Sequence, residues 1–142
     1  MKIALASDHA GYPLKTKLML YLKDAGHEVN DLGCYSSEPA DYPDFGHEIA
    51  RQVSEKKVEY GISLCGSGNG INMTVNKYPL VRPALCWMPE IALLARSHND
   101  ANVCALPARF LNFDEAKEIV EIFLTTDFEG GRHKRRIDKI PL

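Results

Sequence analysis

A cysteine stands directly before a glycine-rich stretch, C-G-S-G-N-G, at residues 65–70. Glycines at 66, 68 and 70 let the backbone turn with unusual dihedral angles and approach a ligand closely. A helix that starts after such a loop offers unpaired N–H groups and the positive end of its dipole, so the stretch is suited to hold an anion. A thiol facing the same positive field is favoured as the thiolate. The stretch therefore predicts an anion cradle with Cys65 as a base or a nucleophile.

Two nucleotide-binding interpretations of this loop are weak. It lacks the lysine and the spacing of a P-loop, and Ile71 stands where a dinucleotide fingerprint needs its third glycine. The alternative without chemistry is a plain glycine turn that joins a strand to a helix.

Basic residues near the C-terminus supply candidates for binding a phosphate. Arg132 and Arg136 are four residues apart, so on a helix they share a face and can clamp one phosphate with forked donors. Arg109 is a third candidate. A solvated basic tail is the alternative interpretation. Among the histidines, His9 and His98 stay open between chemistry and ordinary hydrogen bonding, whereas His27, His47 and His133 are interpreted as capping or hydrogen-bonded polar residues.

The elements that position these residues alternate between two periodicities. Apolar, strand-like runs occur five times, and helical patterns lie between them. The strands are expected at 2–7, 27–32, 60–65, 82–87 and 102–106, and the helices at 13–25, 44–56, 70–77, 89–98 and from Asn112 onward. This alternation predicts an α/β fold, a three-layer αβα sandwich around a five-stranded parallel sheet.

In such folds ligands bind beyond the carboxyl ends of the strands. Polar stretches follow the first strand, S-D-H-A-G at 7–11, and the third, at 65–70. A third polar stretch, S-H-N-D-A-N at 97–102, precedes the fifth strand and so lies at a helix end. If it belongs to the same site, we expect it to come from elsewhere, such as a neighbouring subunit.

Composition limits the class of protein. A chain of 142 residues with 45% apolar content is the size of one domain, so 1–142 is expected to be a single domain with a basic helical extension from about residue 130. A net charge of −2 disfavours general binding to nucleic acid or to an anionic membrane. No apolar stretch resembles a signal peptide or a membrane span, so a cytoplasmic protein is expected. The four cysteines lack metal-type or redox-type pairs and are expected to be separate reduced thiols.

Six motifs in order carry a family resemblance: S-D-H-A-G, D-Y-P-D (41–44), C-G-S-G-N-G, N-K (76–77), R-S-H-N-D-A-N-V (96–103) and E-G-G-R-H-K-R-R (129–136). Together they resemble the ribose-5-phosphate isomerase B family, which includes galactose-6-phosphate and allose-6-phosphate isomerases. The resemblance implies a Rossmann-like or flavodoxin-like sandwich, a homodimer with active sites shared between subunits, no metal and no cofactor. It also implies interconversion of a phosphorylated aldose, ribose 5-phosphate first, with its ketose. Whether two dimers associate into a tetramer is left open.

The resemblance also implies roles for individual residues. Cys65 is the base that removes a proton beside the carbonyl, and Ser67 handles protons on the sugar oxygens. His98 opens the furanose ring, oriented or assisted by Asp8. The remaining implied contacts are the anion hole of Gly66, Ser67, Gly68, Asn69 and Gly70, the enediolate ligand Asn99, and the phosphate-end ligands His9, Arg109, Arg132 and Arg136.

One branch of the family uses a glutamate directly after the glycine loop, where this chain has Ile71. Isoleucine cannot remove a proton, so the base is expected to be Cys65. Allose 6-phosphate or galactose 6-phosphate is the alternative substrate. A flavodoxin-like nucleotide-binding module, a thiol redox protein and a non-catalytic structural protein are alternatives of other classes, and none of them explains Cys65, His98 and the paired arginines together.

Overall fold

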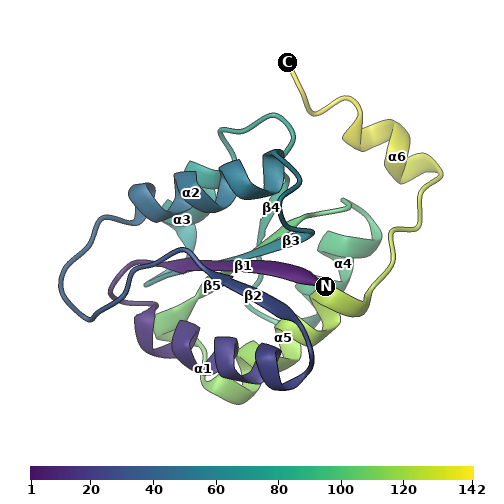
Figure 1. The fold of residues 1–142 in the computed structure, drawn as a ribbon. Coiled ribbons are helices and arrows are strands. Elements are labelled where there is room, and N and C mark those ends of the chain that lie inside the picture. Colours follow the sequence, from purple (N-terminus) through teal and green to yellow (C-terminus); the bar gives the residue numbers. More distant parts are fainter.

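Five parallel strands form the centre of the computed structural model, which describes residues 1–142 (Figure 1). Their order across the sheet is β2-β1-β3-β5-β4, so β3 lies in the middle. The strands are β1 (Lys2–Ser7), β2 (Glu28–Asp31), β3 (Tyr60–Cys65), β4 (Pro83–Leu85) and β5 (Val103–Pro107).

Helices cover both faces of this sheet and give a three-layer αβα sandwich. They are α1 (Tyr12–Asp24), α2 (Tyr42–Ser54), α3 (Asn69–Val75), α4 (Pro89–Ser97), α5 (Phe113–Thr125) and α6 (Arg132–Ile137), with a short 3-10 helix η1 (Ala108–Phe110). Connections that step along the sheet toward β2 use α1 and α4 on one face, and those that step the other way use α2 and α3 on the opposite face. This division of the helices between the two faces results when all crossover connections between parallel strands have the same handedness.

Each face of the sheet has its own apolar core. Alternate residues of β1 point to opposite faces, so Ile3 and Leu5 join α1, α4 and α5, while Ala4 and Ala6 join α2 and α3. The three central strands are almost fully buried, whereas the edge strands β2 and β4 are partly exposed. The nearly unbroken apolar runs seen in the sequence are therefore the central strands, buried on both sides.

The predicted fold class is confirmed, with small differences at element ends. The strand expected at 82–87 is only Pro83–Leu85, because β4 is an edge strand beside β5 alone and Pro83 has no N–H to donate. A capping box starts α5 at Asn112, where the sequence places the start of a helix: the Asn112 side chain accepts from Glu115 N at 2.8 Å and the Glu115 side chain accepts from Asn112 N at 3.1 Å. Gly26, with φ of +91°, follows the end of α1.

All four cysteines are free and buried, as the sequence indicated. Cys86 lies just beyond β4 rather than within it, and its thiol donates to Ala84 O at 3.5 Å. The neighbouring Cys86 thiol, together with burial, raises the pKa of Cys104. Both side chains belong to the apolar core on the face of the sheet that α1, α4 and α5 cover.

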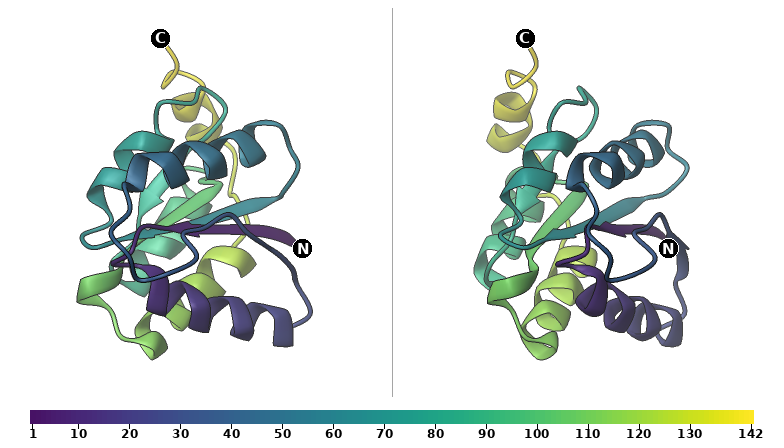
Figure 2. Two further views of the ribbon diagram at one scale, coloured as in Figure 1. Left: turned by 60° about the vertical axis from the view of Figure 1, so that its left-hand side comes forward. Right: turned by 90° about the vertical axis from the view of Figure 1, so that its left-hand side faces the viewer.

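The C-terminal segment departs from the layered body. In Figure 1, α6 lies outside the three layers, at the end of the extended stretch that follows α5, and both views of Figure 2 show it in yellow near the top of the molecule. It occupies the region where a basic helical extension was predicted. None of the helices has the length and hydropathy needed to cross a membrane.

Candidate active site

Three neighbouring strands end side by side and bring the first set of predicted site residues together. β3 is paired with β1 on one side and β5 on the other, and Asp8 N donates to Leu64 O at 3.3 Å just where β1 ends. We refer to these residues as the carboxyl-edge group: Asp8, His9, Cys65, Gly66, Ser67, Gly68, Asn69, Gly70 and Arg109. The group lies where ligands bind in parallel α/β sheets.

Cys65 is the last residue of β3, and its register partner on β5 is Pro107. It is 4% exposed, so its thiol is held in place by the strands on both sides and is nearly out of solvent. The residue that follows it starts the glycine loop, which leads directly into α3. A rigid strand end is a suitable support for a reacting atom because strands hold side chains more firmly than loops do.

The glycines of the loop are required by close neighbours. Gly68 has φ of +77°, and a Cβ there would lie 2.5 Å from Leu85 Cδ1 and 3.1 Å from Pro107 N. At Gly66 a Cβ would lie 2.9 Å from the Arg109 guanidinium, whose own backbone N–H donates to Gly66 O at 3.0 Å. The loop is therefore pressed against β5 and η1, and it presents Arg109 beside the residue that follows the thiol.

Tyr42 is a residue that sequence reasoning gave no role. Its ring packs so tightly against Gly70 that any side chain at that position would overlap it. Tyr42 begins α2 and is 40% exposed, so the ring covers the glycine loop and also faces solvent. The D-Y-P-D motif contained this residue, but only its position over the loop gives it a part in the site.

Asp8 and His9 are fixed by local hydrogen bonds. Asp8 Oδ1 accepts from Ala10 N at 3.0 Å and Gly11 N at 3.2 Å, which leaves its second oxygen without a protein partner. His9 Nδ1 lies 3.1 Å from Ala40 N and 3.3 Å from Ala40 O, so the Ala40 backbone holds the ring in place.

The second set of predicted residues lies at the other end of the strands. We refer to His98, Asn99, Arg132 and Arg136 as the amino-edge group. His98 follows the last residue of α4, a few residues before β5 begins, and the arginines lie on α6. Figure 1 shows α6 on the same side of the molecule as the N-terminus. Asn99 is exposed and its carbonyl accepts from Arg82 Nε at 3.0 Å.

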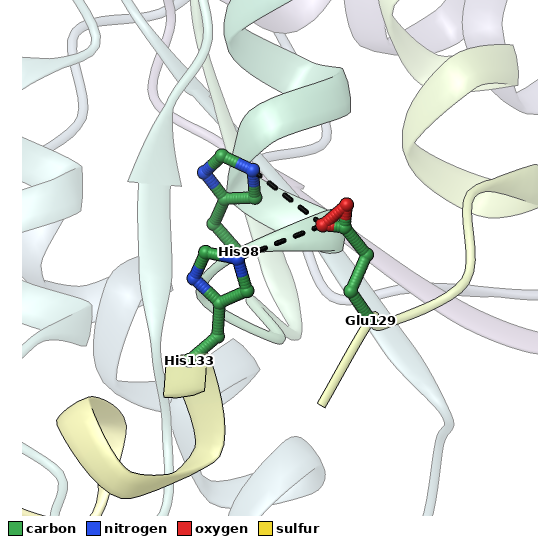
Figure 3. Close-up of side chains that lie close together, drawn as sticks. All are labelled: His98, Glu129 and His133. Atoms are coloured by element: carbon green, nitrogen blue, oxygen red, sulfur yellow. Dashed lines mark ion pairs between the residues drawn. The ribbon is translucent and has the colours of Figure 1, made fainter. Parts of the chain in front are cut away.

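His98 has two neighbours that the sequence did not indicate (Figure 3). The His133 ring stacks on it with centroids 4.1 Å apart and planes 12° apart, and Glu129 Oε2 lies 3.6 Å from Nε2 of each histidine. Burial, then the charges of His98 and Arg132, lower the pKa of His133. The expectation that His133 is an ordinary hydrogen-bonded residue is wrong, since its Nε2 is buried without a hydrogen-bond partner.

For His47 that expectation holds, because Tyr78 Oη lies 3.0 Å from His47 Nδ1.

One chain does not bring the two groups together. The register pairs Gly61 with Val103 and Cys65 with Pro107, so Val103 and Cys65 mark opposite ends of the β3–β5 ladder. Four residue steps along a strand cover about 13 Å, and His98 precedes Val103 by a further five residues. The resemblance assigns Asp8 and His98 to the same step, the opening of the furanose ring. These two residues likewise lie at opposite ends of the strands.

Two clefts lie away from the carboxyl edge. One of about 580 Å³ lies at the amino ends of the strands and is lined by residues such as Tyr60, Arg82 and Arg96. Another of about 630 Å³ lies between the C-terminal segment and the loop before β4, and Asn99 is among its lining residues. Neither contains a member of the carboxyl-edge group.

Comparison with known proteins connects this arrangement to a family. The family model described as Ribose/Galactose Isomerase matches residues 3–140. The chain belongs to the ribose/galactose isomerase family. Within that family it is 41% identical over 139 residues to ribose-5-phosphate isomerase B of Escherichia coli, covering 98% of this chain and 93% of the relative.

Solved structures of the family agree closely with the fold. A ribose 5-phosphate isomerase from Thermotoga maritima is 48% identical with a TM-score of 0.97, covering 99% of this chain and 97% of that one. Ribose-5-phosphate isomerase B from Mycoplasma genitalium, described with bound ribulose-5-phosphate, is 44% identical with a TM-score of 0.94, covering 98% and 93%. The isomerase family that the motifs predicted is therefore confirmed.

Proposed function

We propose that this isomerase-family protein interconverts D-ribose 5-phosphate and D-ribulose 5-phosphate. The observation that carries the proposal is its 44% identity, over 98% of the chain, to the M. genitalium structure described with ribulose-5-phosphate bound. The position of Cys65 at the mouth of the glycine loop supports the same chemistry, because an isomerisation of this kind needs a base beside a set of anion-binding donors.

The proposed reaction begins with ring opening. His98 transfers protons between the ring oxygen and the C1 hydroxyl, so that the ring C–O bond breaks and the C1 aldehyde forms. The Cys65 thiolate then removes the proton from C2, and the electron pair moves onto O1 to give an enediolate. Backbone N–H groups of residues 66–70 and the Asn99 side chain hydrogen-bond the enediolate. Ser67 helps to move the proton from O2 to O1, and Cys65 returns its proton to C1, which gives the ketose.

The phosphate end of the sugar is assigned to cationic and donor side chains. His9 and Arg109 come from the carboxyl edge, and Arg132 and Arg136 from α6. The two α6 arginines are four residues apart on one helix, so their guanidinium groups emerge on one face. Binding the phosphate away from the reacting carbons positions C2 near the Cys65 thiol.

We propose further that the working enzyme is a homodimer in which each active site takes its two groups from different subunits. The separation of the groups in one chain supports this, because Cys65 needs a partner's His98 to act on the same sugar. Apolar side chains left exposed beside and along α4 also support association; they are Trp87, Met88, Leu93 and Leu94. A cytoplasmic location stays a prediction, and association of two dimers into a tetramer stays open.

A substrate panel tests the proposed reaction. The protein, with a chelator present and no added cofactor, is given ribose 5-phosphate, allose 6-phosphate or galactose 6-phosphate, and ketose formation is followed by NMR. We expect the pentose phosphate to give the highest kcat/KM. Turnover confined to a hexose phosphate would leave the proposed mechanism unchanged but would change the proposed substrate. A hexose phosphate is the second candidate because the family description names both ribose and galactose. No turnover on any sugar, together with cofactor absorbance in the purified protein, would favour the nucleotide-binding module.

A further inference from the structure

Three potential metal ligands meet beside the end of α4. One potential ligand atom from each of His98, Glu129 and His133 lies within 4.8 Å of the other two, and Glu129 Oε2 lies 3.6 Å from Nε2 of each histidine. Figure 3 shows both Nε2 atoms directed toward the carboxylate. Two imidazoles and one carboxylate form a donor set that binds Zn²⁺ at sites with a fourth, open position. None of the roles assigned above uses Glu129 or His133.

The buried nitrogen of His133 is the second observation that points to a ligand. The residue is 6% exposed, yet its Nε2 has no hydrogen-bond partner. Glu129 Oε2 faces that atom at 3.6 Å, which is beyond hydrogen-bond distance. A buried polar atom without a partner costs free energy, and an ion placed between the nitrogen and the carboxylate would satisfy both.

The backbone holds the three ligands in this arrangement. Glu129 N donates to Ser97 O at 3.0 Å, which fixes the segment before α6 to the last turn of α4, directly beside His98. His133 N donates to Gly130 O at 3.1 Å and keeps the ring close to the Glu129 side chain. The cluster is therefore tied across segments more than 30 residues apart in the sequence.

Binding an ion requires the movement of one side chain and works against two positive charges. The stacked rings are nearly parallel, so their lone pairs run side by side and do not meet at one point. The His98 ring has to turn, and its side chain, 38% exposed, has room to do so. Arg132 and Arg136 on α6 repel a cation, whereas the Glu129 carboxylate attracts it, so moderate affinity is expected.

We propose that His98, Glu129 and His133 form a binding site for a divalent transition metal ion of the Zn²⁺ and Co²⁺ class, and that the bound ion inhibits the enzyme by occupying Nε2 of His98. The ion is an inhibitor here and takes no part in the reaction. The inhibition rests on the proposed function, because it assumes that His98 opens the sugar ring. The binding itself does not.

Cobalt titration tests the site without using activity. Co²⁺ is added to the chelator-treated protein, and its visible d–d absorption is followed. We expect bands of a four- or five-coordinate ion, with no sulfur-to-cobalt charge-transfer band, since the ligands include no thiolate. The bands should be lost in His133→Gln and in Glu129→Gln and retained in the control His27→Gln, which removes a histidine elsewhere. Circular dichroism checks that each variant is folded.

Zinc inhibition tests the second half of the proposal. Each variant is assayed on ribose 5-phosphate against its own metal-free rate. Loss of a ligand should raise the Zn²⁺ concentration for half inhibition by at least about tenfold in Glu129→Gln and His133→Gln, with no change in His27→Gln. Inhibition that persists in both variants, or a cobalt spectrum with sulfur ligation, overturns the site. Cobalt binding without zinc inhibition overturns the blocking of His98. If no sugar is isomerised the proposed function fails, and the cobalt titration alone then decides the site.

Discussion

Cys65 is the residue on which the proposed chemistry depends most. We predict that Cys65→Ala lowers kcat for ribose 5-phosphate by about 10²–10⁴-fold, the usual contribution of a general base. Binding of a phosphate-bearing ligand should change little, because the proposed phosphate contacts are other residues. Steady-state kinetics and calorimetric titration of a non-reacting sugar phosphate measure the two effects separately.

Cys104→Ala is the matched control for this substitution. Cys104 is also a buried cysteine of a central strand, but it lies near the start of β5 and its thiol neighbours Cys86. Cys104→Ala should lower the free energy of unfolding and leave kcat unchanged. Equal losses of kcat in the two variants would mean that Cys65 acts through packing and not as a base.

The protonation of His133 is a second residue-scale prediction. Burial and then the charges of His98 and Arg132 lower its pKa, so in the metal-free protein its ring should titrate below 6.5. Removing the neighbouring charge in His98→Ala should move the midpoint upward. NMR of the imidazole protons measures both. A midpoint at or above 6.5 in the wild type would contradict the packing seen in Figure 3.

The sign of the effect on stability follows from the same shift. A histidine whose pKa is lowered by folding binds its proton more readily in the unfolded chain. The free energy of unfolding that neutral His133 contributes therefore decreases as the pH falls below about 6.5. The decrease is complete once the pH is below the pKa of His133 in the folded protein. Acidification should loosen the packing of α6 against His98 before the sheet is affected.

At the scale of elements, the glycine loop gives the sharpest prediction. Gly26→Ala and Gly68→Ala both place alanine at positive φ, of +91° and +77°. Nothing lies within 4 Å of a Cβ at Gly26, whereas Gly68 is pressed against Leu85 and Pro107. We expect Gly26→Ala to cost about 1–2 kcal/mol from backbone conformation alone. Gly68→Ala should cost about 1–3 kcal/mol more from overpacking and should also impair turnover.

Urea unfolding of the two variants measures this difference. The shared backbone conformation makes Gly26→Ala the control for Gly68→Ala. If both variants lose the same stability, the loop has room that the structure does not show, and its glycines serve only the turn.

The elements were predictable from sequence where burial and local signals agreed. The central strands are continuous apolar runs, and Asn112 with Glu115 marks the start of α5 by local hydrogen bonds. The edge strand β4 was predicted too long, because an exposed edge imposes no clear apolar pattern on 82–87. The surroundings of His98 were not predictable, since Glu129 and His133 reach it from a segment whose direction no local pattern determines. The same reason hid the packing of Tyr42 on Gly70.

At the scale of the whole molecule, the parallel sheet itself separates the two halves of the proposed site. Strand ends carry Asp8 and Cys65 to one edge, and the return of α4 carries His98 to the other. The sequence already indicated this division, because His98 and Asn99 precede a strand, whereas S-D-H-A-G and C-G-S-G-N-G each follow one. What it could not give is the surface that joins two chains, for which the exposed side chains around α4 are the structural candidates.

Complementation between two inactive variants tests the central claim most directly. Cys65→Ala and His98→Ala are purified separately, each shown to be folded and inactive on cyclic ribose 5-phosphate, then mixed under conditions that allow subunits to exchange. In a shared-site dimer, a mixed pair contains one site with both native residues, so a random mixture should recover roughly a quarter of the wild-type activity. Native mass spectrometry counts the mixed dimers. Mixed dimers that form without any recovery of activity would contradict an active site built from Cys65 of one subunit and His98 of its partner.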